Sequence, residues 1–126
     1  MAQRLLFLAL AGAIGTVARF LLLEVVKSRA GTALPLGTFV VNITGCFLTG
    51  IFMEIWDAHF HPASESRLVV LVGFMGAFTT FSSVMAETAF MIRHSDWLLV
   101  PLNLLLQNSF GLLSVFGGIA AARAFI

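Results

Sequence analysis

The sequence predicts an all-α membrane protein with four transmembrane helices. The chain has 126 residues, of which 60% are hydrophobic and only 10% charged, and its mean hydropathy is +1.02. A soluble domain of this size has too little interior to bury so much apolar surface. The charges largely avoid the long apolar runs, and each run approaches the about 20 residues that cross a bilayer. Four spans leave no room for a soluble catalytic domain, and no basic run indicates nucleic-acid binding, so we expect neither an enzyme nor a nucleic-acid partner.

The four apolar runs form one domain, residues 1–126. As spans they cover about residues 5–26, 36–56, 68–92 and 97–125. The first run lacks a short apolar core followed by a small-residue cleavage site, so we expect a retained helix rather than a signal peptide. Trp56 and Trp97 stand at span ends, where indole rings favour the membrane–water interface. We therefore expect a multi-pass protein of a cell membrane, with the bacterial inner membrane as the favoured location.

Cations are distributed evenly between the two sides of the predicted spans. The two sets are Arg4, Arg67 and Arg123 on one side and Lys27, Arg29 and Arg93 on the other. With three against three, the positive-inside rule gives no preferred orientation. We interpret this balance as a sign that the subunit inserts both ways and pairs antiparallel, as a dual-topology dimer. The alternative is a single orientation, chosen by the insertion machinery from a weak difference in charge between the two sides.

Each span carries one stripe of small or polar residues spaced three or four apart, which places them on one helix face. Lipid does not favour such a face, so we expect it to meet protein or water. For the glycines and Cys46, close helix packing is the simpler interpretation. Asn42, Gln107 and Glu87 are different, because an amide or carboxylate within a membrane is costly and usually marks a pathway or a partner.

Arg19 lies near the far end of the first span, and Glu24 follows five residues later. From these positions both side chains can reach the headgroups, and snorkelling is the interpretation that we favour. The alternative is that Arg19 places a positive potential at the vestibule of an anion path.

The third span concentrates glycines and hydroxyl residues in the stretch GFMGAFTTFSS, residues 73–83. Glycine weakens a helix, and Ser or Thr side chains can replace lost backbone hydrogen bonds. We therefore expect the third helix to break near the bilayer midplane. Such a break is tolerated only where protein buries it or an aqueous cavity meets it. Its free carbonyls can hold a cation and its free N–H groups an anion.

Three segments in order along the chain resemble the Fluc (CrcB) family of fluoride channels. They are G-x-x-G-x-x-x-R-F at 12–20, G-T-x-x-V-N-x-x-G at 37–45 and G-F-x-G-x-x-T-T-F-S at 73–82, followed by Glu87. The matches occupy three of the four spans, so the resemblance covers nearly the whole chain. It implies an antiparallel dimer with two narrow pores that conduct fluoride passively out of the cell.

The resemblance also implies roles for individual residues. Asn42 and Phe81 match the asparagine and the phenylalanine of the fluoride path, and the positive ring edge of Phe81 would face the anion. Gly76 and Thr79 match the residues whose carbonyls hold a structural, non-transported Na⁺ at the dimer centre. Hydroxyl and amide donors along the path would replace hydration water. The other expected pore residues are Thr38, Thr80, Ser82, Ser83, Val84, Glu87 and Gln107.

Three of these positions are harder to interpret. Val84 stands where the family pattern T-T-F-S-T-F has its second phenylalanine. Either one of the two aromatic rings is dispensable, or Phe78 substitutes for the missing ring, or the subunit pairs with an unlike subunit. Glu87 is awkward beside an anion, and it would accept a bond from Gln107 or a hydroxyl, stay protonated, or orient other donors. Gln107 stands where smaller hydroxyl residues are frequent in the family.

The leading interpretation is thus a passive, fluoride-selective channel made of two copies of this chain. One alternative is a conduction-impaired partner subunit of a channel built from unlike homologous subunits, which Val84 makes worth keeping. A less favoured alternative is a small multidrug transporter. Such transporters need an intramembrane carboxylate early in the chain, whereas the first span has Glu24 only at its end.

Overall fold

The computed structural model describes residues 1–30, 36–59 and 65–126, and helices account for most of them. The long helices are α1 (Ala2–Ala30), α2 (Leu36–His59) and α6 (Leu99–Arg123). A further helical region is built from α3 (Glu65–Leu68), the π-helical η1 (Val69–Met75), α4 (Gly76–Phe78) and α5 (Phe81–Arg93). These four regions are long and apolar enough to cross a membrane, which confirms the predicted number. Residues 31–35 and 60–64, within two of the expected loops, lie outside the described ranges.

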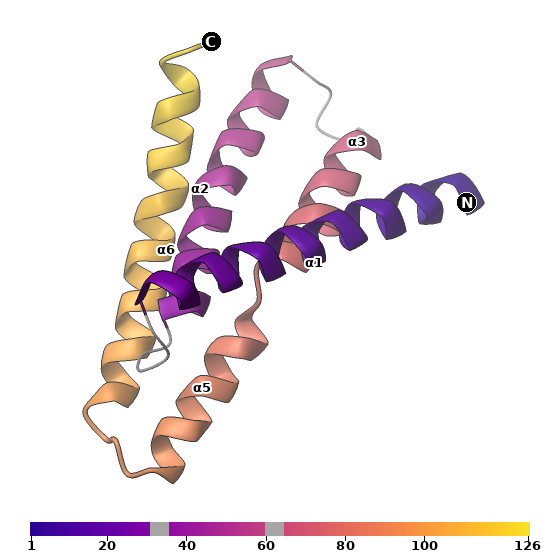
Figure 1. Ribbon diagram of the computed structural model, residues 1–126. Coiled ribbons are helices and arrows are strands. Elements are labelled where there is room, and N and C mark those ends of the chain that lie inside the picture. Colours follow the sequence, from indigo (N-terminus) through magenta and orange to yellow (C-terminus); the bar gives the residue numbers. More distant parts are fainter. Residues whose placement is uncertain (31–35, 60–64) are drawn as a thin grey trace.

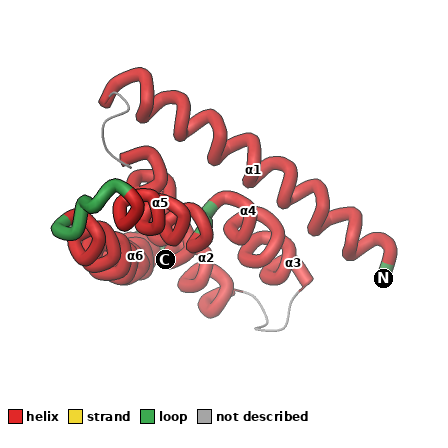
Figure 2. The backbone as a smooth tube through the Cα atoms, turned by 90° about the horizontal axis from the view of Figure 1, so that it is seen from below, coloured by secondary structure: helices red, strands yellow, loops and turns green. Residues whose placement is uncertain are grey.

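The helices pack around α2, which has the most extensive contact with α6. Figure 1 shows these two helices side by side, with α1 crossing in front of them. Seen from below, α1 runs along one side of the other helices (Figure 2), where it packs against η1, α2 and α4. Helix α5 packs mainly against α6. The chain therefore brings α2, the start of α5 and α6 together at the place where the candidate site lies.

Glycines allow the closest helix contacts. A methyl group at Gly50 would collide with the backbone oxygen of Val115, and one at Gly118 would collide with that of Phe47. On the other side of the molecule, a methyl group at Gly15 would meet the backbone oxygen of Phe74. Backbones approach this closely only where no side chain intervenes. The packing role predicted for these glycines is confirmed.

Polarity is inverted relative to a soluble protein. The residues that are buried include Thr88, Asn103 and Gln107, whereas many large apolar side chains are exposed, especially along α1. In water such an apolar surface would favour aggregation or association. Hydrocarbon imposes no such penalty on Leu, Ile or Phe, and helices in lipid pack through small and polar residues. The pattern is that of a multi-pass membrane protein.

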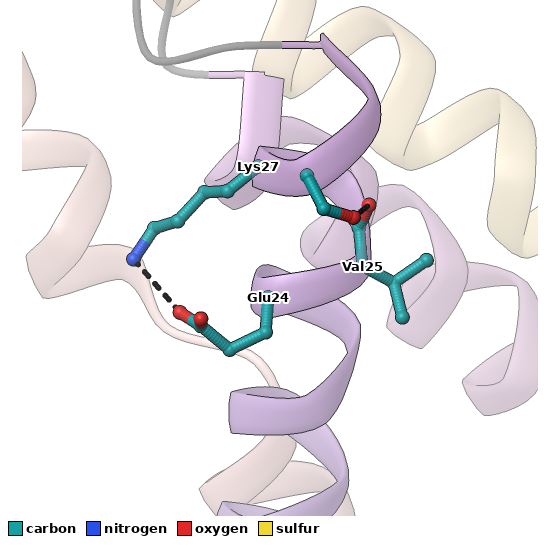
Figure 3. A network of polar contacts seen from close by, with 4 residues as sticks. Glu24, Val25 and Lys27 are labelled. Carbon is teal, nitrogen blue, oxygen red and sulfur yellow. Dashed lines mark hydrogen bonds and ion pairs between the residues drawn. The ribbon is translucent and has the colours of Figure 1, made fainter.

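Helix α1 continues beyond the predicted span 5–26. Near its end the ammonium group of Lys27 lies 3.2 Å from the Glu24 carboxylate oxygen Oε1. Figure 3 shows these two side chains directed toward each other. Both side chains are more than half exposed. In the same turn the Ser28 hydroxyl donates to the Val25 carbonyl at 2.9 Å. The last turn of α1 is thus polar, which suits the membrane–water interface expected there.

The turn between α5 and α6 differs from the expected start of the fourth span. Ser95 adopts a positive φ of 61°, and the Asp96 amide donates back to the Met91 carbonyl at 2.9 Å. Together with the Ser95 amide on the Ile92 carbonyl, at 3.1 Å, this is a Schellman ending of α5. Trp97 therefore lies in the turn, and α6 begins at Leu99.

Between α4 and α5 the backbone is extended at two residues. Thr79 has φ −99° and ψ 154°, and Thr80 has φ −153° and ψ 123°. The backbone amide and the hydroxyl of Thr79 both donate to the Met75 carbonyl, at 2.9 and 3.0 Å, which closes the end of α4. Helix α5 then begins at Phe81 and runs in a different direction (Figure 1).

Candidate functional site

A pocket of about 180 Å³ opens beside the two extended threonines. It lies among α2, α5 and α6, so residues far apart in the sequence share it. The lining residues are Asn42, Cys46, Thr79, Thr80, Phe81, Val84, Gln107 and Asn108. Most of them were predicted from the sequence as pore or cation-site residues. The structure thus brings the centre of the predicted path together in one place.

Asn42 joins α2 to the extended segment through both branches of its side-chain amide. Its Oδ1 accepts from the backbone N–H of Thr80 at 3.1 Å. Its Nδ2 donates to the backbone carbonyl of Thr80 at 3.4 Å and to Oε1 of Gln107 at 3.3 Å. One side chain therefore contacts both backbone groups of Thr80, and it supplies the partner of the Thr80 amide, which precedes the first helical residue of α5.

Gln107 is buried on α6, with 8% of its surface exposed. Its Oε1 accepts from Asn42, whereas its Nε2 is buried and has no hydrogen-bond partner among the described residues. A buried donor without a partner is rare and unfavourable. Gln107 also lines the pocket.

Glu87 lies on α5, where the hydroxyl of Thr38 donates to its Oε1. Of the partners expected for Glu87, the structure therefore shows a hydroxyl and not Gln107, whose carbonyl oxygen pairs with Asn42. The second oxygen, Oε2, is buried without a hydrogen-bond partner in the described parts of the chain. Thr38 and Glu87 do not line the 180 Å³ pocket.

A second buried polar contact joins α5 and α6. The Asn103 amide donates to the Thr88 hydroxyl at 3.2 Å, and that hydroxyl donates to the Val84 carbonyl at 2.7 Å. Asn103 and Gln107 are four residues apart on α6 and therefore share a face. Polar groups thus line the packed face of α6 over more than one turn.

The side chain of Arg19, for which we favoured snorkelling to the headgroups, contacts α5 in the structure. Its guanidinium donates to the Ser83 hydroxyl in the first turn of α5, at 3.2 Å. Glu24, by contrast, pairs with Lys27 at the exposed end of α1. Because the Arg19 charge is directed at α5, it contributes a positive potential near the start of that helix.

The hydroxyls of Thr80 and Ser82 contact each other at 2.7 Å, and either oxygen can be the donor. Ser82 is exposed and does not line the pocket. Ser83 is likewise absent from the lining, because its hydroxyl faces Arg19. Of the three predicted hydroxyl residues in this segment, only Thr80 reaches the pocket.

The aromatic rings near the site have different environments. Phe81 lines the pocket and is 70% exposed. Phe78 is 4% exposed, stacks on Phe74 with ring centroids 5.9 Å apart, and belongs to the core. Phe78 therefore does not replace the missing second ring within this chain. Val84 is itself 3% exposed and lines the pocket at that place.

Two pocket residues were not predicted as site residues. Asn108 is exposed on α6, and its amide donates to the Leu104 carbonyl at 2.7 Å. A pattern of residues three and four apart missed it because it lies on the face next to that of Gln107. Cys46 was assigned to packing, and its Sγ does lie 3.5 Å from the position of a methyl group at Gly111.

The predicted cation ligands are backbone carbonyls, and their surroundings fit that role. In a continuous helix the Gly76 carbonyl would accept from the Thr80 amide, but that amide donates to Asn42. Thr79 is extended, so its carbonyl also leaves the helical pattern. Gly76 is exposed. Within the described ranges no cluster of three or more His, Cys, Asp or Glu offers a metal site.

Comparison with known proteins gives one family. The model of the CrcB-like, camphor-resistance (CrcB) family matches residues 6–119. A protein of Desulforapulum autotrophicum named fluoride-specific ion channel FluC is 45% identical over 98% of both chains. A protein of the same name from Nitrosococcus oceani is 44% identical, and the alignment covers 96% of this chain and 97% of that protein. Another, from Solidesulfovibrio magneticus, is 42% identical over 98% of both chains. The chain is therefore a multi-pass membrane protein of the CrcB family, which consists of ion channels and not of enzymes.

Proposed function

We propose that this chain forms a fluoride-selective channel that carries fluoride passively out of the cytoplasm and so lowers its internal concentration. The observation that carries the proposal is the pocket beside Thr79 and Thr80, where Asn42, Gln107 and Phe81 meet inside a membrane protein. The names of the relatives support the choice of anion. The remaining candidate path residues are Thr38, Ser82, Ser83, Val84 and Glu87, with Arg19 at the vestibule.

The pocket offers neutral groups that suit a small anion. Amide and hydroxyl donors can replace the water molecules that fluoride loses. The ring of Phe81 carries a positive edge, which attracts an anion without a fixed charge. The single lysine of the chain, Lys27, is at the end of α1 and is paired with Glu24. A path lined by neutral donors binds an anion weakly enough to release it, as conduction requires.

A second copy of the chain in antiparallel orientation completes the proposed channel. Phe81, Gly76 and Asn108 are exposed in the single chain although they adjoin the pocket or the extended segment. Polar and aromatic groups exposed in this way inside a bilayer favour a protein partner over lipid. The balanced cation count is compatible with both orientations. In this arrangement the extended residues Thr79 and Thr80 interrupt the third span near the bilayer midplane.

A structural Na⁺ would be held by the carbonyls of Gly76 and Thr79 from both copies. Oxygen ligands without a net charge suit a monovalent hard cation. When bound, the cation would supply positive charge that holds the two extended segments together. Two features of this chain support the assignment: the Thr80 amide, which would bond to the Gly76 carbonyl in a helix, donates to Asn42 instead, and Thr79 is extended.

The alternative of a partner subunit in an unlike pair rests on Val84. This residue occupies the pocket wall with an isopropyl group, which has no positive edge. A homomeric channel requires that the exposed ring of Phe81, from one or both copies, is sufficient. An unlike pair would bring the second ring from the other subunit.

Fluoride efflux from liposomes tests the proposal directly. Liposomes that contain only this chain should release fluoride and retain chloride. Release of fluoride only after co-reconstitution with a homologous subunit would favour the unlike pair. Proton-coupled uptake of an organic cation, without fluoride release, would instead indicate a multidrug transporter.

A further inference from the structure

A second pocket, of about 200 Å³, lies between α5 and α6 beside the first turn of α2. The described lining residues are Leu36, Phe39, Met91, Leu99, Leu102, Asn103 and Leu106. None of these residues lines the 180 Å³ pocket beside Thr79 and Thr80. Met91 is ten residues beyond Phe81 along α5, which corresponds to a rise of about 15 Å. This second space, the α5–α6 pocket, is therefore separate from the site described above.

The described walls of the α5–α6 pocket are apolar apart from Asn103. The amide of Asn103 already donates to the Thr88 hydroxyl at 3.2 Å, and that hydroxyl donates to the Val84 carbonyl at 2.7 Å. Water needs several polar partners to occupy a protein cavity, whereas an apolar cavity of about 150 Å³ can hold a guest the size of benzene. A stretch of hydrocarbon chain therefore suits the α5–α6 pocket better than water or an ion.

The α5–α6 pocket lies at the level where the membrane surface is expected. Met91 is two residues before the end of α5, and Leu99 is the first residue of α6. The turn between them contains Trp97, which is 65% exposed, and indole rings favour the membrane–water interface. Figure 1 shows this turn at the lower end of the molecule, away from the break between α4 and α5. A lipid whose headgroup lies at the turn would have its acyl chains at the level of the pocket.

Arg93 supplies a cation at the same level, because it is the last residue of α5 and is exposed. The ion pairs of the described residues use Lys27, Arg67 and Arg123. Arg93 is therefore not paired with Asp96, in the same turn, or with any other described carboxylate. A cation at a membrane surface attracts anionic headgroups, and a guanidinium can donate two parallel hydrogen bonds to a phosphate. A free arginine beside an apolar pocket matches the two parts of an anionic lipid.

We infer that the α5–α6 pocket is a binding site for an anionic phospholipid, whose acyl chain enters the pocket and whose phosphate pairs with Arg93. The chain enters from the bilayer, because two of the wall residues, Leu102 and Leu106, are 45% and 37% exposed. The lipid would brace α5 against α6 at the end where these helices are joined. The inference does not depend on which ion the protein conducts.

Native mass spectrometry of the intact protein in detergent tests the inference, because the mass of an adduct identifies the bound lipid. The protein is titrated with phosphatidylglycerol, which is anionic, or with phosphatidylcholine of identical acyl chains. Phosphatidylglycerol should bind saturably, with a midpoint about fivefold lower, the factor that one cation contributes at an anionic lipid surface. Glycerol phosphate, which has no acyl chain, should not compete. Equal midpoints for the two lipids would overturn the inference.

Arg93→Gln tests the headgroup contact. This variant should raise the midpoint for phosphatidylglycerol to that for phosphatidylcholine. The matched control is Arg29→Gln, which removes an exposed cation expected on the same side of the membrane and should leave both midpoints unchanged. If the two variants behave alike, Arg93 does not hold the headgroup and the inference is wrong.

Leu106→Phe tests the place of the acyl chain, because a larger side chain fills part of the pocket. It should weaken the binding of both lipids, whereas Leu105→Phe, at a 65% exposed position outside the pocket lining, should not. Unchanged binding in Leu106→Phe would overturn the inference by placing the lipid elsewhere. Lipid adducts on monomers but not on dimers would also overturn it, because a second copy of the chain would then cover the pocket.

Discussion

Thr80 pairs both of its backbone groups with the side chain of Asn42, donating to Oδ1 at 3.1 Å and accepting from Nδ2 at 3.4 Å. A residue on α2 thus performs the hydrogen bonding that a helix would otherwise provide for Thr80. Without it, the Thr80 amide would lose its hydrogen-bond partner within the membrane, which is strongly unfavourable. The contact also places the two amides of the site beside the start of α5.

Asn42→Asp should abolish fluoride flux. The carboxylate can still accept from the Thr80 amide, but its second oxygen cannot donate to the Thr80 carbonyl as Asn42 does. It adds a negative charge beside the path and repels an anion, and it also removes the donor that orients Gln107. Fluoride efflux from liposomes measures the loss, and size-exclusion chromatography in detergent checks assembly. Normal conduction by a well-assembled Asn42→Asp protein would remove Asn42 from the path.

Gly118→Ala should destabilise the α2–α6 pair, and Gly117→Ala provides a matched control. A methyl group at Gly118 would collide with the Phe47 carbonyl, whereas one at Gly117 would lie 3.8 Å from the Phe47 ring, an ordinary contact. Overpacking of this kind costs about 1–3 kcal/mol. Thermal unfolding in detergent should therefore show a lower midpoint for Gly118→Ala alone. Equal midpoints for the two variants would mean that α2 and α6 do not pack this closely.

Glu87→Gln should conduct fluoride about as well as the unchanged protein. An amide oxygen can accept from the Thr38 hydroxyl as Glu87 Oε1 does, and an amide carries no negative charge that would repel an anion. The efflux rate is the measurement, with Thr38→Val as the companion variant that removes the donor. If Glu87→Gln abolishes flux while Thr38→Val does not, the carboxyl group itself is required.

Exchange of sodium for a large monovalent cation should weaken the proposed dimer. The carbonyls of Gly76 and Thr79 are released from the helix, and a larger ion would not fit between two closely packed copies. The dimer fraction, measured by chemical crosslinking in detergent at constant ionic strength, should fall in N-methylglucamine chloride and recover in sodium chloride. A dimer that is indifferent to the cation would argue against an ion at these carbonyls.

The sequence was sufficient to predict the four spans because hydrophobic length is a local property. Glycine faces such as that of Gly50 and Gly118 were also predictable, since residue spacing determines which residues share a helix face. Contacts between side chains of different helices could not be predicted from the sequence. The pairs Arg19–Ser83 and Thr38–Glu87 depend on the rotation and depth of each helix, which single-helix patterns do not contain.

At the central site, too, the sequence predicted individual residues but not the contacts between them. The positions of Asn42 and Gln107 within the spans predicted a functional role for both, because amides are costly within a membrane. Their mutual contact, and the free Nε2 that results, needed the positions of α2 and α6 together. Asn108 was missed because it stands one position beyond the polar face of α6, and only the pocket beside α5 reveals it.

The measurement that most directly tests the central claim is fluoride-electrode recording of efflux from liposomes that hold only this chain. The liposomes are loaded with potassium fluoride, and valinomycin carries the compensating charge. The account predicts rapid fluoride release, with negligible chloride release from matched liposomes loaded with potassium chloride. Assembled protein that releases no fluoride, or that releases chloride equally well, would contradict it.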